Sequence, residues 1–113
     1  MLKVSFRIDL PGGERIGPGK VALLGWVDRT GSITQAAKAM KMSYRRAWLL
    51  VETLNRLAPT PMVETAHGGK RGGGAQLTAI GRKLLTRYAA MERAIDRATA
   101  MERRAVDRLL QGR

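Results

Sequence analysis

The sequence contains no cysteine and a single histidine, His67. Disulfide bonds, thiol catalysis and cysteine-ligated metal sites are therefore excluded, and one histidine cannot form a zinc site by itself. The remaining polar residues form no Ser-His-Asp set and no pair of carboxylates in an apolar stretch. We therefore expect these residues to form no enzyme active site, no cofactor site and no metal site.

Long apolar runs and aromatic residues are also scarce. No run approaches the roughly 18 apolar residues that a membrane-spanning helix needs, and the alternating N-terminus lacks the continuous apolar core of a signal peptide. We therefore expect a cytoplasmic protein with no membrane partner. Because aromatic residues make up only 4% of the 113 residues, a core of aliphatic side chains and methionine is expected, within one small domain.

Acidic residues are few compared with basic ones. Nine Asp and Glu residues stand against 21 Lys and Arg residues, which gives a net charge of +12. Such a surplus on one small domain indicates a polyanionic partner, either nucleic acid or an anionic membrane surface. The alternative is a generally basic surface without a specific partner.

The first elements are predicted from apolar spacing and from chain breaks. Apolar and polar residues alternate from Leu2 to Leu10, which is typical of a half-buried strand. Pro11-Gly12-Gly13 ends that strand. A helix is then predicted from about Pro18 to Asp28, and Gly31 lies just beyond its end.

Two capped helices separated by a tight turn follow. Ser32, with Gln35 three residues on, forms the capping-box pattern at the start of a short helix. Lys41-Met42 predicts the turn, and Ser43 is expected to cap a third helix that reaches about Leu57. Apolar residues recur in this helix at three- and four-residue spacing, so they are predicted to face the core: Tyr44, Ala47, Trp48, Val51, Leu54 and Leu57.

A hairpin with a glycine-rich, basic loop is predicted next. Residues 61–66 and 75–78 have the pattern of two short strands, and residues 67–74 join them. A phosphate-binding P-loop requires Ser or Thr after its Gly-Lys pair and then a helix, but Arg71 follows Lys70 here. We interpret the loop as a wing whose Lys70 and Arg71 contact DNA; the alternative is a plain surface linker.

Thr78 is expected to cap a single long helix over residues 79–110. About 30 helical residues span about 45 Å, whereas a compact body of 100 residues has a radius of gyration near 13 Å. Part of the apolar stripe therefore needs cover, either from the same helix of a second copy or from the chain's own domain. We predict a homodimer through Leu84, Tyr88, Met91, Ile95 and Ala98. Residues 1–78 would form the DNA-binding part, and residues 79–113 the dimerisation helix of the same domain.

The order of these elements predicts a helix-turn-helix, whose second helix enters the major groove of DNA. Arg45 and Arg46 lie in the first turn of that helix, where an arginine can pair with guanine or with a phosphate; the alternative is a solvated helix face. For Tyr44 the alternative is that its ring packs beneath the turn, and for Gln35 the alternative is that it is a local helix cap. The predicted DNA-contacting residues are Thr34, Gln35, Lys41, Ser43, Tyr44, Arg45, Arg46, Lys70 and Arg71.

Several short motifs resemble one known family. Gly-Ser-Ile-Thr-Gln-Ala-Ala-Lys at 31–38, Met-Ser-Tyr-Arg-Arg-Ala-Trp at 42–48, Asn55, Val63-Glu64, Gly-Gly-Lys-Arg-Gly-Gly-Gly-Ala at 68–75, Leu77-Thr78 and Gly81 are similar to the DNA-binding domain of ModE-type molybdate-responsive regulators. LysR-type regulators share the helix-turn-helix more distantly. The resemblance implies a mostly helical α+β fold, namely a winged helix-turn-helix dimer that binds operator DNA and regulates molybdate transport or molybdenum enzymes.

The resemblance covers about residues 19–91. Members of that family carry C-terminal oxyanion-binding domains, and no stretch up to Arg113 matches their molybdate pocket, so we do not expect these residues to bind molybdate. The sequence therefore predicts a bacterial, sequence-specific regulator that binds a roughly palindromic operator as a homodimer. The alternatives are a sequence-independent architectural DNA-binding protein and a protein-interaction module.

Overall fold

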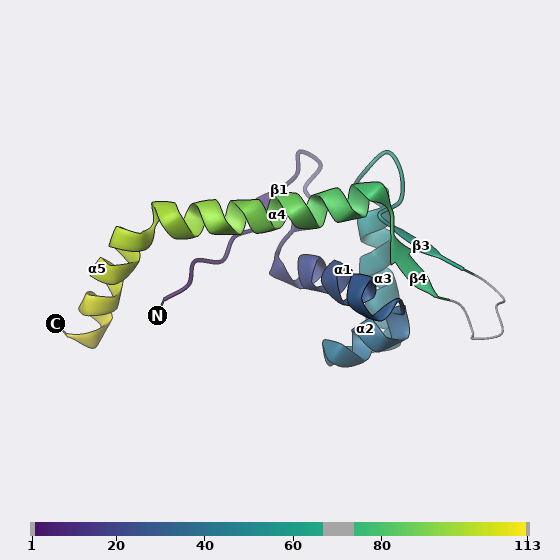
Figure 1. Ribbon diagram of the computed structural model, residues 1–113, viewed down its shortest axis with the longest axis horizontal. Coiled ribbons are helices and arrows are strands. Elements are labelled where there is room, and N and C mark those ends of the chain that lie inside the picture. The colour runs from purple at the N-terminus through teal and green to yellow at the C-terminus, as the bar shows by residue number, and fades with distance from the viewer. Residues whose placement is uncertain (1, 67–73, 113) are drawn as a thin grey trace.

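The computed structural model describes residues 2–66 and 74–112, which form helices and two short antiparallel hairpins (Figure 1). The chain order is β1 (Ile8–Asp9), β2 (Arg15–Ile16), α1 (Pro18–Thr30), α2 (Ile33–Ala39), α3 (Tyr44–Arg56), β3 (Val63–Thr65), β4 (Ala75–Leu77), α4 (Ala79–Ala98) and α5 (Ala100–Gln111). This confirms the predicted α+β class with a helix-turn-helix and a hairpin after it. Within the described residues, no helix is long and apolar enough to cross a membrane.

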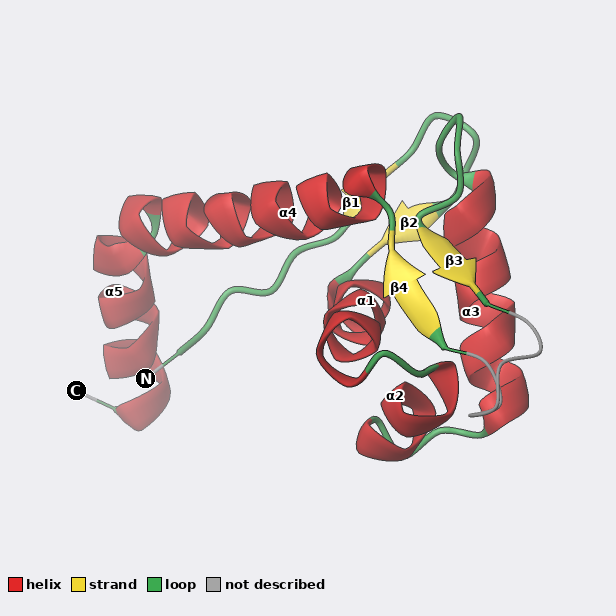
Figure 2. Cartoon of the chain, turned by 45° about the vertical axis from the view of Figure 1, so that its right-hand side comes forward, coloured by secondary structure: helices red, strands yellow, loops and turns green. Residues whose placement is uncertain are grey.

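The core lies where α1, α2 and α3 meet the β3–β4 hairpin (Figure 2). Three- and four-residue spacing places the apolar residues of each helix on one face, and that face is turned inward. Aliphatic side chains dominate as expected, since full burial of one such side chain contributes about 1.5–3 kcal/mol. The largest fully buried side chains are Leu23, Leu24, Val27, Val51 and Leu54.

The predicted caps at Gly31, Ser32 and Ser43 are confirmed, except that the Ser32 amide donates to Oγ1 of Thr30 and not to Gln35. Gly31 ends α1 in the left-handed conformation with φ of 67°, and its amide donates to the Val27 carbonyl at 2.8 Å. The Ser32 hydroxyl accepts from the amide of Gln35 at 3.1 Å, and the Ser43 hydroxyl accepts from the amide of Arg46 at 3.1 Å. These caps fix where α2 and α3 start, so they also fix which residues form the first turn of each helix.

The predicted hairpin is also confirmed, and α3 holds it in place. Val63 pairs with Leu77 and Thr65 with Ala75. The Asn55 side chain accepts from the amides of Met62 at 2.9 Å and Val63 at 3.0 Å, and its amide donates to the Val63 carbonyl at 3.3 Å. One side chain on α3 therefore satisfies the backbone where β3 begins.

The predicted strand from Leu2 to Leu10 is wrong in its length. Only Ile8 and Asp9 pair with another strand, because the partner ends at Ile16 and Pro18 already begins α1. Residues 2–7 run along α4 without strand pairing, and we call them the N-terminal arm (Figure 1). Alternation still predicts part of the packing, because Phe6 and Ile8 are half-buried.

The single helix predicted over residues 79–110 is also wrong, because the structure breaks it at Thr99. Helix α4 ends at Ala98, Thr99 has φ of −103° and ψ of 6°, and α5 leaves at a sharp angle (Figure 1). In an unbroken helix the Asp96 carbonyl would accept from the amide of residue 100. Here that carbonyl accepts from Nη2 of Arg103 at 2.7 Å, so a side chain takes a position in the backbone ladder.

Arg103 also ties the N-terminal arm to this break. Its Nε donates to Oγ1 of Thr99 at 3.1 Å and its Nη1 to the Leu2 carbonyl at 3.3 Å, and only 12% of its side chain is exposed. Further along the arm, Tyr88 donates its hydroxyl to the Phe6 carbonyl at 2.6 Å and stacks on the Phe6 ring at 4.4 Å. Burial, and secondarily the charge of Glu92, raise the pKa of Tyr88 above its ordinary value, which keeps the hydroxyl available as a donor.

We expect Arg103→Lys to loosen the arm and the α4–α5 break together. Lysine keeps the positive charge but cannot present the fork that reaches Leu2, Asp96 and Thr99 at once. The expected loss is about 1–3 kcal/mol of unfolding free energy, with faster amide exchange in residues 2–7. Arg104→Lys, at an exposed neighbouring position, is the matched control. Equal behaviour of the two variants would contradict this role for Arg103.

Candidate nucleic-acid interface

A tight turn joins α2 to α3 and sets the angle between them. The Lys41 amide donates to the Lys38 carbonyl at 3.1 Å, and the Met42 amide donates to the Ala37 carbonyl at 3.0 Å. Lys41 itself has φ of 55°, the left-handed region that a residue with a side chain seldom adopts. This conformation closes the turn in few residues, and the exposed Lys41 side chain lies beside the start of α3.

The outer face of α3 carries the two arginines predicted to contact DNA. Arg45 and Arg46 are exposed, whereas Ala47 and Val51, on the opposite side of the helix, are buried. Because Ser43 caps the helix directly before them, both arginines lie in the first turn. An arginine there combines a forked donor with the positive end of the helix dipole, which suits a phosphate or the edge of guanine.

Tyr44 corrects one expectation about the core. It was predicted to face inward, but 53% of it is exposed. Its ring meets the half-buried Trp48 ring edge-on, with centroids 6.0 Å apart. The first residue of α3 therefore lies outside the core cluster that Ala47 and Val51 join. The phenol is thereby left accessible beside Arg45.

The α2–α3 unit carries no acidic residue from its start to Leu50, and Glu52, in the second half of α3, is exposed. Thr34, Gln35, Lys38 and Lys41 are all exposed, and no acidic residue occurs between Arg29 and Val51. Within residues 2–66 and 74–112, the ion pairs lie outside α2 and α3: Arg7 with Asp9, Arg82 with Asp28, and Arg103 with Asp96. The part of the unit before Glu52, which includes the first turn of α3, therefore presents a continuous positive field, which attracts a polyanion.

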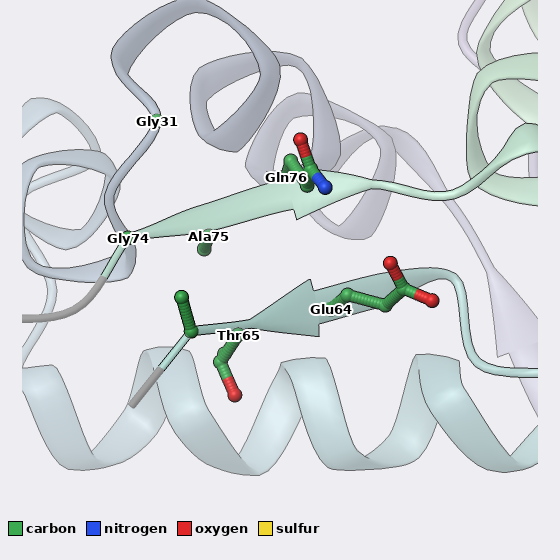
Figure 3. A pocket seen from close by; sticks show the side chains of 7 residues that line it. Gly31, Glu64, Thr65, Gly74, Ala75 and Gln76 are labelled. Atoms are coloured by element: carbon green, nitrogen blue, oxygen red, sulfur yellow. The ribbon is translucent and has the colours of Figure 1, made fainter. Parts of the chain in front are cut away.

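The strands of the predicted wing are attached to the corner between α1 and α2. The Gly31 carbonyl accepts from the amide of Ala75 at 2.9 Å. A pocket beside this contact is lined by the α1–α2 corner and both strands (Figure 3). Its only charged lining side chain among the described residues is Glu64, which would repel a phosphate. The predicted contacts Lys70 and Arg71 lie outside the described residues.

Two residues of this surface were not predicted as contacts. Arg29, at the end of α1, lies over the Trp26 ring with its guanidinium carbon 4.2 Å from the ring centroid, which holds it near the corner at Gly31. Leu49 is 54% exposed on the outer face of α3. Leu49 could have been found in the sequence, because its spacing places it with Arg45 and Arg46, opposite the residues that face the core.

The residues predicted to form the dimer interface lie in different environments. Leu84 packs against the core and Tyr88 is 2% exposed, so their own chain already covers both. Ile95 is half-buried, whereas Met91 and Ala98 are exposed. Helix α5 adds exposed apolar side chains that were not in the prediction: Met101, Val106, Leu109 and Leu110.

Comparison with solved structures identifies the class of fold. MepR, a transcription regulator of Staphylococcus aureus, matches 86% of this chain and 76% of its own with a TM-score of 0.63 and 17% identity. A MepR–DNA complex matches 87% of this chain and 82% of its own with a TM-score of 0.62, also at 17% identity. At this identity the likeness concerns the fold alone. The described residues thus have the fold of a winged helix-turn-helix protein.

Comparison of sequences narrows the class to one group of relatives. The chain is 40% identical over 96 residues to the molybdenum transport protein ModE of Azotobacter vinelandii, which covers 85% of this chain and 35% of that protein. It is 43% identical over 83 residues to the transcriptional regulator ModE of Haemophilus influenzae, and the match covers 74% of this chain and 32% of that protein. It is 49% identical over 80 residues to the molybdenum-pterin-binding protein MopB of Rhodobacter capsulatus, and the match covers 71% of this chain and 30% of that protein.

No protein-family model matches the chain. The relatives nevertheless agree with one another, and the chain is related to the N-terminal, DNA-binding region of ModE-type regulators. It spans about a third of the length of the relatives it matches.

Proposed function

We propose that this chain is a site-specific DNA-binding transcription regulator. The observation that carries the proposal is the α2–α3 unit, in which Ser43 caps the helix that presents Arg45 and Arg46 outward. Helix α3 then lies in the major groove, where the arginines read base edges, and the exposed Thr34, Gln35 and Lys41 contact the backbone. The wing loop between β3 and β4 contacts the neighbouring phosphates or minor groove through Lys70 and Arg71.

The proposal includes a homodimer formed through α4 and α5. Exposed apolar residues at Met91, Met101, Leu109 and Leu110 need cover that this chain does not provide. Pairing of residues 79–113 with a second copy covers them and relates two DNA-binding parts, residues 1–78, by a two-fold axis. The operator is then roughly palindromic, with half-sites about 34 Å apart, one turn of the double helix.

The regulated genes are proposed to serve molybdate transport or molybdenum enzymes. This part is supported by the relatives, whose names describe molybdenum transport, molybdenum-pterin binding and transcription regulation. At the wing corner, the charged side chain that lines the pocket among the described residues is Glu64, which does not suit an oxyanion. We therefore expect DNA binding by this chain to be independent of molybdate.

Selection of DNA tests the proposal directly. The purified chain is used to capture duplexes from random and genomic pools, with and without molybdate. The affinity for the selected duplex is then measured at salt concentrations from roughly 50 to 200 mM. We expect a palindromic consensus, the same in both conditions, found near molybdenum-related genes. Capture without any consensus, by binding that disappears as salt rises, would instead establish a sequence-independent DNA-coating protein, for which the net charge of +12 suffices.

A further inference from the structure

One apolar side chain stands out on the otherwise polar outer face of α3. Leu49 is 54% exposed, and helical spacing places it on the same face as Arg45 four residues before it and Arg46 three residues before it. Thr53, one turn further on, uses its hydroxyl within the helix, where it donates to the Leu49 carbonyl at 3.0 Å. The neighbouring Leu50, by contrast, is half-buried against the core.

A single exposed leucine is common on protein surfaces and usually needs no explanation. The position of Leu49 is what gives it meaning, since the arginines beside it are the groups proposed to enter the major groove. Side chains on that face meet the base edges rather than bulk solvent once DNA is bound. A leucine there cannot bind a phosphate and cannot hydrogen-bond a base.

The major groove offers one apolar group, the C5-methyl of thymine. We propose that Leu49 contacts this methyl group and thereby selects thymine at one position of each half-site. Four residues of helix rise by about 6 Å, and base pairs are spaced by about 3.4 Å. The selected thymine therefore lies about two base pairs from the base that Arg45 contacts. This inference rests on the proposed function, because it requires α3 to lie in the major groove.

The contact adds selectivity and little general affinity. The arginines attract any duplex, whereas Leu49 contributes only where a methyl group meets it. Leu49→Ala should therefore weaken binding to the selected duplex and leave both the binding to random duplex and the salt dependence of affinity unchanged.

Replacement of thymine by deoxyuridine tests the inference, because it removes the methyl group and leaves the base pairing intact. Each thymine of the duplex selected from the random pool is replaced in turn, in both half-sites together. At one position we expect the wild-type protein to lose about fourfold in affinity per half-site, or about 15-fold in all, from burial of a methyl group at about 0.8 kcal/mol each. Leu49→Ala should bind the thymine and deoxyuridine duplexes equally.

Arg15→Ala, at an exposed position on β2, is the control and should retain the wild-type dependence on thymine. Thermal unfolding of Leu49→Ala should match the wild type, because the side chain makes little contact with the core. Specific binding by the wild type that tolerates deoxyuridine at every position would overturn the role of Leu49 and leave the proposed function standing. The same conclusion holds if Leu49→Ala stays as sensitive to deoxyuridine as the wild type. Failure to select any consensus would overturn both.

Discussion

Arg45→Ala is expected to lower the affinity for each half-site of the selected operator by about fivefold to more than 100-fold and to relax the preference at one base pair of each half-site. The exposed guanidinium lies in the first turn of α3, where a bidentate pair with guanine contributes about 1–3 kcal/mol of discrimination. Alanine removes both donors and leaves guanine acceptors without a partner. Affinity titrations with the selected duplex, and with single-base variants of it, measure the loss and locate the position.

The control for Arg45→Ala is again Arg15→Ala, which removes the same charge from an exposed position on β2. It should lower binding to selected and random duplexes alike, and only slightly. Lys41→Ala is expected to weaken binding to the selected and random duplexes by a common factor. It should also reduce the salt dependence of the affinity by about one phosphate contact. If Arg45→Ala also weakened both duplexes by one factor, Arg45 would contact only the backbone.

Asn55→Ala is expected to lower the free energy of unfolding by about 2–5 kcal/mol. Alanine leaves the amides of Met62 and Val63 without the acceptor that Asn55 supplies at 2.9 and 3.0 Å. Each unpaired polar group in a partly buried position costs about 1–3 kcal/mol. Because these bonds attach the start of β3 to α3, the hairpin should open locally before the helices unfold.

Chemical denaturation gives the change in free energy, and amide exchange at Met62 and Val63 shows whether the hairpin opens first. Asn55→Asp is the matched control, since it keeps an oxygen that accepts from both amides but places its second carboxylate oxygen against the Val63 carbonyl, where the 3.3 Å bond is lost. The free energy of unfolding should fall less in Asn55→Asp than in Asn55→Ala. An alanine variant as stable as the wild type would show that water replaces these bonds at no cost.

The helix-turn-helix could be predicted because its signals are local. Ser32 and Ser43 cap their helices through amides three residues away, and Gly31 ends α1 by a conformation that glycine adopts without strain. Apolar spacing then gave the buried face of each helix. These are interactions among neighbours in the chain, so the residues alone specify them.

The errors occurred where a residue depends on a partner far along the chain. Alternation over Leu2 to Leu10 correctly predicted a strand in this region, at Ile8 and Asp9. The length of the strand, however, depends on the partner strand, which ends at Ile16. The break at Thr99 depends on Arg103, whose guanidinium also reaches Leu2. Nothing in the spacing of α4 and α5 indicates that contact, because 101 residues separate its two ends.

The sequence by itself determined the class of the protein: the first three helices, their caps, the hairpin and a basic α2–α3 unit with no acid before Glu52. Only the tertiary structure placed Tyr44 outside the core, although helical spacing predicted that its side chain would face inward. Only it showed Asn55 holding the hairpin and Arg103 bending the C-terminal helices. The physical reason is range: caps and amphipathic faces form within a few residues, whereas exposure and long-range hydrogen bonds arise from how the elements pack.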